Sequence, residues 1–259
     1  MGQNSSDGMN FIGQVVQWFL DGAHWQGDGG IPHRTLEHLA MSGVSLLVAA
    51  LIALPIGIAI GHFGKGGNLA INISNIGRAI PSFALLVLAA QLFGIAAAAQ
   101  IVGFGAVPAF VALVALAVPP MVTNSYVGMR EVDPDVREAA RGMGMRERAV
   151  LLRVELPIAL PLIMAGIRTS AVNVVATATL AAVVGWGGLG RFIVDGLGLQ
   201  DYPMLYAGAV MVAVLSLIVE FTLAGVQRLS TPAGLRPSKS SQKEGPSETA
   251  ALDTAAVAA

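Results

Sequence analysis

Five long apolar runs constrain this sequence more than any other feature. They cover residues 40–61, 76–93, 106–127, 157–184 and 206–227. A bilayer core about 30 Å thick is crossed by about 20 apolar residues in an α-helix, which satisfies its own backbone hydrogen bonds in lipid. Only 12% of the residues are charged and 54% are hydrophobic. The chain is therefore predicted to be an all-α, polytopic membrane protein with about five core transmembrane helices.

The sequence on either side of these runs has a different character. Residues 1–37 are predicted to be extracytoplasmic, with an amphipathic helix at the membrane interface over residues 9–20. The first ten residues carry no basic stretch and are not expected to be a cleaved secretory signal. Residues 230–259 have no apolar periodicity and are predicted to form a disordered tail. The membrane domain is thus expected at residues 38–229.

Basic residues indicate the orientation in the membrane, because positively charged loops stay in the cytoplasm. If the loop between the third and fourth runs is cytoplasmic, all but three of the 15 Lys and Arg residues lie on that side. The exceptions are Arg34 and Arg191 outside and Arg168 within a span. The predicted topology is that of a multi-pass protein of the cytoplasmic membrane, with the N-terminus outside and the C-terminus inside.

The composition argues against several functions. A net charge of −1 does not suit a nucleic-acid-binding surface, and a chain with no cysteine has no disulfides or thiolate metal sites. The sequence shows no metal-ligand cluster and no catalytic constellation, so catalysis is not expected. The histidines lack metal-ligand spacing and are predicted to be surface or interface residues: His24, His33, His38 and His62.

Residues 130–157 form the longest charged interruption between two apolar runs. Asp133 is a good N-cap and Pro134 fits the first position of a helix. Gly142 and Gly144 allow the left-handed turn that ends such a helix. The loop is therefore predicted to be a helix, a break and a second helix that begins near Met145.

The same loop carries a spaced pattern: Glu138-Ala139-Ala140, then Gly144, then Leu156-Pro157. With its place between two spans, this pattern resembles the EAA loop of MetI-like permeases of binding-protein-dependent ABC importers. The resemblance implies a coupling helix that docks on cytoplasmic ABC ATPase subunits. An ordinary positively charged loop without a partner is the alternative.

The residues expected to form this coupling loop are Glu138, Ala139, Ala140, Gly142, Gly144, Leu156 and Pro157. Small alanines let a helix approach closely, and Ala139, Ala140 and Met143 are predicted to form an apolar patch that fits a groove of another protein. Gly144 permits a sharp turn, and Pro157 fixes the entry of the next span.

The resemblance also implies partners and a substrate class. A second permease subunit, identical or similar, and an extracytoplasmic substrate-binding protein are expected, in contact with membrane lipid. ATP and Mg would be bound by the ATPase, so no cofactor is expected in this chain. The stretches 79–86, 141–145, 154–169 and 185–190 resemble the osmoprotectant branch, which carries glycine betaine, choline or carnitine.

Other functions remain open. Methionine, sulfonate and nitrate permeases share parts of the pattern. An ion-coupled secondary carrier would need intramembrane carboxylates or discontinuous helices, and a channel would need a polar stripe through several spans.

Polar or helix-breaking residues inside spans are candidates for the translocation path: Pro81, Ser82, Asn173 and Thr177. The alternative for Asn173 and Thr177 is hydrogen bonding between helices. Arg168 is expected to snorkel or to pair with an acidic neighbour, and Glu220 to be an interfacial carboxylate rather than a proton relay.

Glycines carry two further expectations. Gly185, Gly187, Gly188 and Gly190 lack the Gly-Lys-Ser/Thr ending of a phosphate loop and are interpreted as a bend at the outer end of the fourth span, with a direct substrate contact as the alternative. Gly57, Gly61, Ala165 and Gly166 are expected to allow close helix contacts.

Overall fold

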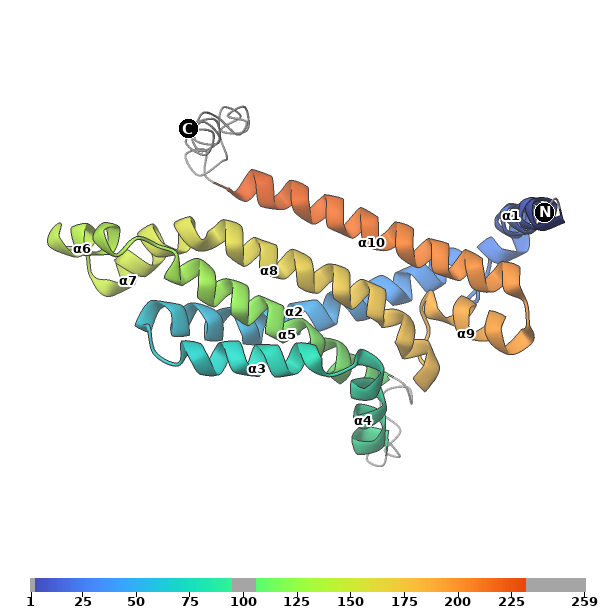
Figure 1. Ribbon diagram of the computed structural model, residues 1–259, viewed down its shortest axis with the longest axis horizontal. Coiled ribbons are helices and arrows are strands. Elements are labelled where there is room, and N and C mark those ends of the chain that lie inside the picture. The colour runs from blue at the N-terminus through green and yellow to red at the C-terminus, as the bar shows by residue number, and fades with distance from the viewer. Residues whose placement is uncertain (1–2, 95–105, 232–259) are drawn as a thin grey trace, which may run out of the picture.

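The protein is built from helices in the part of the chain that the computed structural model describes, residues 3–94 and 106–231 (Figure 1). In chain order they are α1 Gln3–Leu20, η1 Gly22–Trp25, α2 Ile31–Phe63, α3 Gly67–Ala79, α4 Ser82–Gly94, α5 Ala106–Arg130, α6 Pro134–Gly142, α7 Glu147–Val150, η2 Leu151–Glu155, α8 Leu156–Thr177, η3 Ala178–Val184, α9 Gly190–Leu199 and α10 Tyr202–Ser230. η1 and η3 are 3-10 helices and η2 is a π-helix. The predicted tail at 230–259 lies outside the described residues apart from its first two.

Four helical segments among the described residues are long and apolar enough to cross a membrane. They are Ile31–Phe63, Ala106–Arg130, Glu147–Val184 and Tyr202–Ser230, with 33, 25, 38 and 29 residues. The third is continuous from α7 through η2, α8 and η3. These segments match four of the five predicted spans and confirm an all-α, polytopic protein.

The expected second span, residues 76–93, is not one continuous helix. α3 ends at Ala79, Ile80 is extended with a ψ of 123°, and α4 begins at Ser82. Pro81 explains the break, because proline has no amide hydrogen and its ring forces the preceding residue away from helical geometry. α3 contacts α2 and α5; α4 also contacts α5 but turns steeply away from the direction of α3 (Figure 1). Pro81, expected to be a helix-breaking residue, therefore separates the second run into two helices.

α5 lies at the centre of the bundle. In its apolar part 56% of the residues are buried, compared with 11% in α10. α2 and α8 both pack against α5. A Cβ atom at Gly57 would lie 2.7 Å from the Cβ of Ser125, and one at Gly166 would lie 2.7 Å from the Cβ of Asn124. The close helix contacts expected at these glycines are confirmed within the chain.

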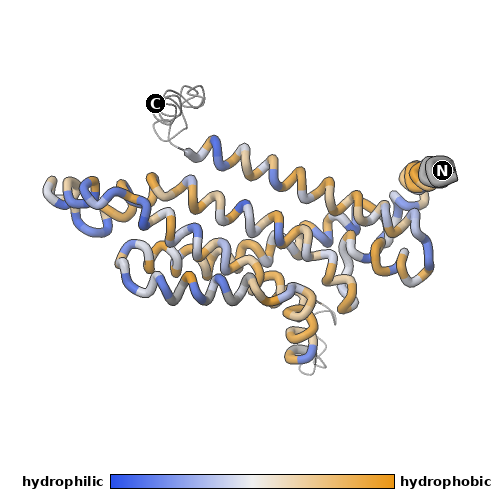
Figure 2. Tube along the Cα trace, in the orientation of Figure 1, coloured by the Kyte–Doolittle hydropathy of each residue, from blue (hydrophilic) through white to orange (hydrophobic). Residues whose placement is uncertain are grey.

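The two ends of the bundle differ in chemistry. Hydrophilic residues gather around α6 and α7 at one end and around the α9–α10 turn at the other, with apolar helices between them (Figure 2). α1 lies at the second end and is seen nearly end-on in Figure 1, so it crosses the direction of the long helices. Its Phe11 ring contacts Tyr206 of α10 with a centroid distance of 4.9 Å. The predicted helix at residues 9–20 is confirmed and begins earlier, at Gln3.

Candidate functional site

The charged loop at the α6 end folds as a helix, a break and a helix. The Asp133 carboxylate accepts a hydrogen bond from the Asp135 amide at 2.8 Å and caps α6, with Pro134 at its first position. Gly144 has a φ of +83°, the left-handed conformation expected of it. The second helix, α7, begins at Glu147, two residues later than predicted. The predicted arrangement is confirmed.

An ion pair spans the break between α6 and α7. Nε of Arg141 lies 2.7 Å from Oε1 of Glu147, and both side chains are exposed. The hydrogen bond from Arg141 to the Glu147 carboxylate raises the pKa of Arg141 above its usual range. Arg141 therefore remains charged, and the pair links the two short helices.

The exposed apolar surface of α6 differs from the predicted patch in one member. Ala140 is only 2% exposed and faces the protein itself. Met143 is 76% exposed and Val136 is 42% exposed, while Glu138 and Ala139 are also on the surface. The sequence could not show which face of this short helix the protein covers. The surface open to another molecule therefore consists of Val136, Ala139 and Met143.

A buried ionic cluster lies directly behind this loop. Glu155, at the end of η2, is fully buried, and its Oε2 accepts a 2.5 Å hydrogen bond from Nδ1 of His62 in the last turn of α2. Its Oε1 lies 3.0 Å from Nε of Arg137 in α6. Leu156 and Pro157 follow Glu155 and begin α8. This cluster was not predicted from the sequence, although an acidic residue directly before Leu156-Pro157 needs a partner when it is buried.

The prediction that the histidines lie at the surface or at an interface is wrong for two of the four. His38 is 1% exposed, and its Nε2 lies 2.8 Å from the carbonyl oxygen of Val175. The His62 side chain is only 8% exposed. Both sit on α2 where it faces other helices, so tertiary packing buries them and supplies their polar partners.

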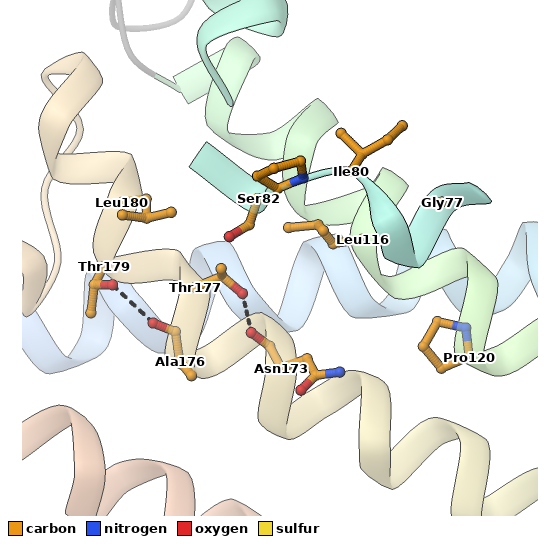
Figure 3. A pocket seen from close by; sticks show the side chains of 11 residues that line it. Gly77, Ile80, Ser82, Leu116, Pro120, Asn173, Ala176, Thr177, Thr179 and Leu180 are labelled. Carbon is orange, nitrogen blue, oxygen red and sulfur yellow. Dashed lines mark hydrogen bonds between the residues drawn. The ribbon is translucent and has the colours of Figure 1, made fainter. Parts of the chain in front are cut away.

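A cavity of about 570 Å³ lies between the α3–α4 break, α5 and the end of α8 (Figure 3). All four residues predicted for the translocation path line it: Pro81, Ser82, Asn173 and Thr177. The remaining lining residues include Gly77, Ile80, Leu116, Pro120 and Leu180. Its walls thus combine hydroxyl, amide and apolar groups, and none of the described residues that line it is charged.

The polar wall of this cavity coincides with the change from α8 to the 3-10 helix η3. The hydroxyl of Thr177 donates to the carbonyl oxygen of Asn173, and Thr179 Oγ1 donates to that of Ala176 at 2.8 Å (Figure 3). These bonds are made within the same helical segment. Thr177 therefore uses its hydroxyl to satisfy its own backbone rather than to join a second helix.

The glycine segment at residues 185–190 forms the bend that follows η3. Gly185 and Gly188 have φ values of +87° and +82°. The amide of Gly188 donates a 2.8 Å hydrogen bond to Oε2 of Glu37 in α2. A Cβ at Gly187 would lie 2.5 Å from Cδ of the same carboxylate. Glu37, for which the sequence pattern predicted no role, therefore links α2 to this bend.

Glu37 also holds two basic neighbours of its own helix. Arg34 Nη1 lies 2.9 Å from Oε2, and His33 Nε2 lies 3.4 Å from Oε1. Spacings of three and four residues place these side chains on one helix face.

Arg168 pairs with an acidic neighbour, one of its two expected outcomes. Its Nε lies 3.3 Å from Oε1 of Glu220, and its Nη1 donates to Gln227 at 3.0 Å. Gln227 in turn donates to the carbonyl oxygen of Pro161 at 2.9 Å. These contacts join α8 to α10, and they give Glu220 a structural partner.

The helices are long enough to span a membrane, one end of the bundle carries an exposed helical loop, and a cavity lies between helices. Together these features are typical of a transport protein. Residues 53–232 match the family model of the binding-protein-dependent transport system inner membrane component. The chain belongs to this family, which confirms the resemblance found in the sequence.

Individual relatives cover most of the chain. The choline transport system permease protein OpuBB of Bacillus subtilis is 38% identical over 80% of this chain and 92% of its own length. The glycine betaine/carnitine/choline transport system permease protein OpuCB of the same organism is 37% identical, over 82% and 93%. The carnitine transport permease protein OpuCB of Listeria monocytogenes is 34% identical, over 87% and 97%.

The fold has a close counterpart among solved structures. A chain of the MetNI methionine ABC transporter in an inward-facing conformation superposes with a TM-score of 0.65 and 25% identity. The match covers 78% of this protein and 96% of that chain.

Proposed function

We propose that this chain is the permease subunit of an ATP-driven importer for a small quaternary ammonium osmoprotectant, such as choline, glycine betaine or carnitine. The observation that carries the proposal is the 34–38% identity to permeases of this branch over at least 92% of their length. The methionine transporter chain shares the fold at 25% identity, which makes methionine the second candidate substrate.

The proposed ATPase contact is the exposed surface of α6. Val136, Ala139 and Met143 present apolar groups at an end of the bundle where hydrophilic residues gather (Figure 2). Apolar side chains exposed in such surroundings are typical of a helix that seats in the groove of a partner. ATP and Mg would be bound by that partner.

The α6 end is proposed to face the cytoplasm, and the end with α1 and α9 the outside. Arg130, Arg141, Arg146 and Arg148 all lie in or next to the α6–α7 loop, in agreement with the rule for positive loops. An extracytoplasmic binding protein would then deliver substrate at the opposite end, and a second permease subunit, identical or similar, would complete the transporter.

The cavity is proposed as part of the translocation path. Its volume of about 570 Å³ is within the usual range for a small-molecule site. A quaternary ammonium group has no N–H to donate, so a path of apolar groups and oxygen atoms suits it better than a wall of hydrogen-bond acceptors alone. Brief, weak contact also permits release, because a transport path must let its substrate leave.

The test is uptake of labelled choline and glycine betaine by the assembled transporter in vesicles. Gly144→Asn is the informative variant, because asparagine tolerates the left-handed conformation and no neighbour lies within 4 Å of its Cβ position. The added side chain should impair docking and lower ATP-dependent uptake by about tenfold, a typical strength for coupling between sites. Gly66→Asn is the matched control, since Gly66 has a φ of +85° and equally open surroundings in the α2–α3 turn.

Each part of the proposal has its own contrary result. Uptake of methionine but of neither quaternary amine would overturn the substrate class. Equal uptake by Gly144→Asn and Gly66→Asn, at equal membrane levels, would contradict the role of the loop.

A further inference from the structure

The fully buried carboxylate of Glu155 lies where four helical elements meet. It belongs to η2, which leads directly into α8. His62 reaches it from the last turn of α2, and Arg137 reaches it from α6. Arg137 also donates to the carbonyl oxygen of Met129 near the end of α5. These three side chains therefore connect α6 to α2, α5 and α8.

Burial makes these connections difficult to break. A carboxylate or guanidinium group that loses its partner inside a protein is left as an unpaired charge, which is strongly destabilising. Glu155 is 0% exposed, and the side chain of Arg137 is 11% exposed. The exposed pair of Arg141 and Glu147 can separate into water instead, since its side chains are 46% and 61% exposed. α6 is thus held to the long helices mainly by these buried contacts and only weakly by the exposed pair.

The local backbone is adapted to this arrangement. Residues 151–155 form a π-helix, in which an extra residue in the turn changes the direction of the side chains that follow. Such turns are rare and are often found at functional sites. Here the π-helix ends at the residue that carries the buried carboxylate.

We propose that Glu155 is a positioning residue for energy coupling: with His62 and Arg137 it joins α6 to the adjoining ends of α2, α5 and α8, so that they move as one body. This inference rests on the proposed role of α6 as the ATPase contact. A displacement of α6 by the ATPase then reaches three long helices directly, including α8, whose far end lines the cavity.

The first test measures how firmly α6 is held to the end of α2, without measuring transport. Spin labels are placed on the full chain in lipid nanodiscs at Lys65→Cys, after α2, and at Asp135→Cys in α6. Both positions are exposed, and the protein has no cysteine of its own. A single narrow distance distribution is expected, with a clearly broader one in Glu155→Gln. Equal widths in the two proteins would overturn the proposal.

The second test uses the assembled transporter in vesicles and compares solute uptake with ATP hydrolysis. Glu155→Gln should keep its ATP hydrolysis while uptake per ATP falls by about tenfold, within the range of couplings between distant sites. Arg191→Gln is the control, because it breaks an ion pair with Asp195 in α9 at the other end of the bundle. An unchanged ratio in Glu155→Gln would contradict the proposal.

A second pair of variants covers a failure of Glu155→Gln to accumulate in the membrane. His62→Leu removes one donor and keeps the pair of Arg137 and Glu155, and His62→Gln restores a donor. Uptake per ATP should fall in His62→Leu and recover in His62→Gln. Equal ratios in both variants would contradict the proposed connection between α6 and the long helices. An inactive wild-type transporter would contradict the proposed function. The distances between the spin labels would still test whether Glu155 holds α6 to the long helices.

Discussion

At the scale of the residue, Gly188 meets two separate requirements. Its φ of +82° favours glycine, and its amide holds the Glu37 carboxylate. A Cβ there would also lie 3.2 Å from Nδ1 of His38, a buried side chain that has little room to move. The bend at residues 185–190 therefore depends on glycine for conformation and for space.

Gly188→Ala is expected to reduce the stability of the folded protein by about 1–2 kcal/mol, the usual cost of a left-handed conformation in a residue with a Cβ. Gly198→Ala is the control, because Gly198 lies in α9 and has no atom within 4 Å of its Cβ position. It should be neutral or slightly stabilising. Thermal unfolding in detergent measures both, and equal midpoints for the two variants would refute the strain argument.

At the scale of the element, α10 is the long helix with the least burial, and polar contacts supplement its packing. Arg168 and Glu220 form the ionic contact between α8 and α10, and Gln227 adds hydrogen bonds to Arg168 and to a carbonyl of α8. The side chains of Arg168 and Glu220 are about one-third exposed, on two helices that lie in lipid. An unpaired charge there is costly.

Arg168→Met is expected to destabilise the protein by about 2–3 kcal/mol, because it leaves the Glu220 carboxylate unpaired in the membrane. The double variant Arg168→Met with Glu220→Met should recover most of this loss. Arg191→Met breaks a pair of similar exposure, 33% for each side chain, at the end of the bundle and should cost less than about 1 kcal/mol. The midpoint of thermal unfolding ranks the three proteins, and a double variant no more stable than Arg168→Met would exclude this account.

At the scale of the whole molecule, the two ends of the bundle are proposed to face different compartments. Met143 in the α6 end is 76% exposed and Leu199 at the end of α9 is 74% exposed. Because the chain has no cysteine, each can be replaced by a cysteine that is the only one in this protein to react.

A membrane-impermeant maleimide applied to intact cells, or to spheroplasts where an outer membrane is present, is expected to label Leu199→Cys and not Met143→Cys. Permeabilised cells that express the permease without its ATPase should give labelling of both, which controls for access, because a bound ATPase would cover Met143. The opposite pattern in intact cells would reverse the proposed orientation and move the ATPase contact away from α6.

The sequence alone determined the features that depend on local physics. Apolar runs long enough for a bilayer predicted five spans, because lipid requires the backbone to bond with itself, and four of these are long helices in the structure. Asp133, Pro134 and Gly144 predicted the start and end of α6, because caps and left-handed turns act within a few residues. Pro81 marked the interruption of the second run, although not that α4 would turn away from α3.

The tertiary structure decided everything that depends on which surfaces meet. Glu155 and His62 are 93 residues apart, and no local pattern pairs them. Pro81 and Ser82 are adjacent, and Asn173 and Thr177 are four residues apart on one helix face, so the sequence places each pair together; packing brings the two pairs around one cavity. Ala140 faces inward for the same reason: periodicity gives a helix its faces, but contacts with distant parts of the chain determine which face is buried.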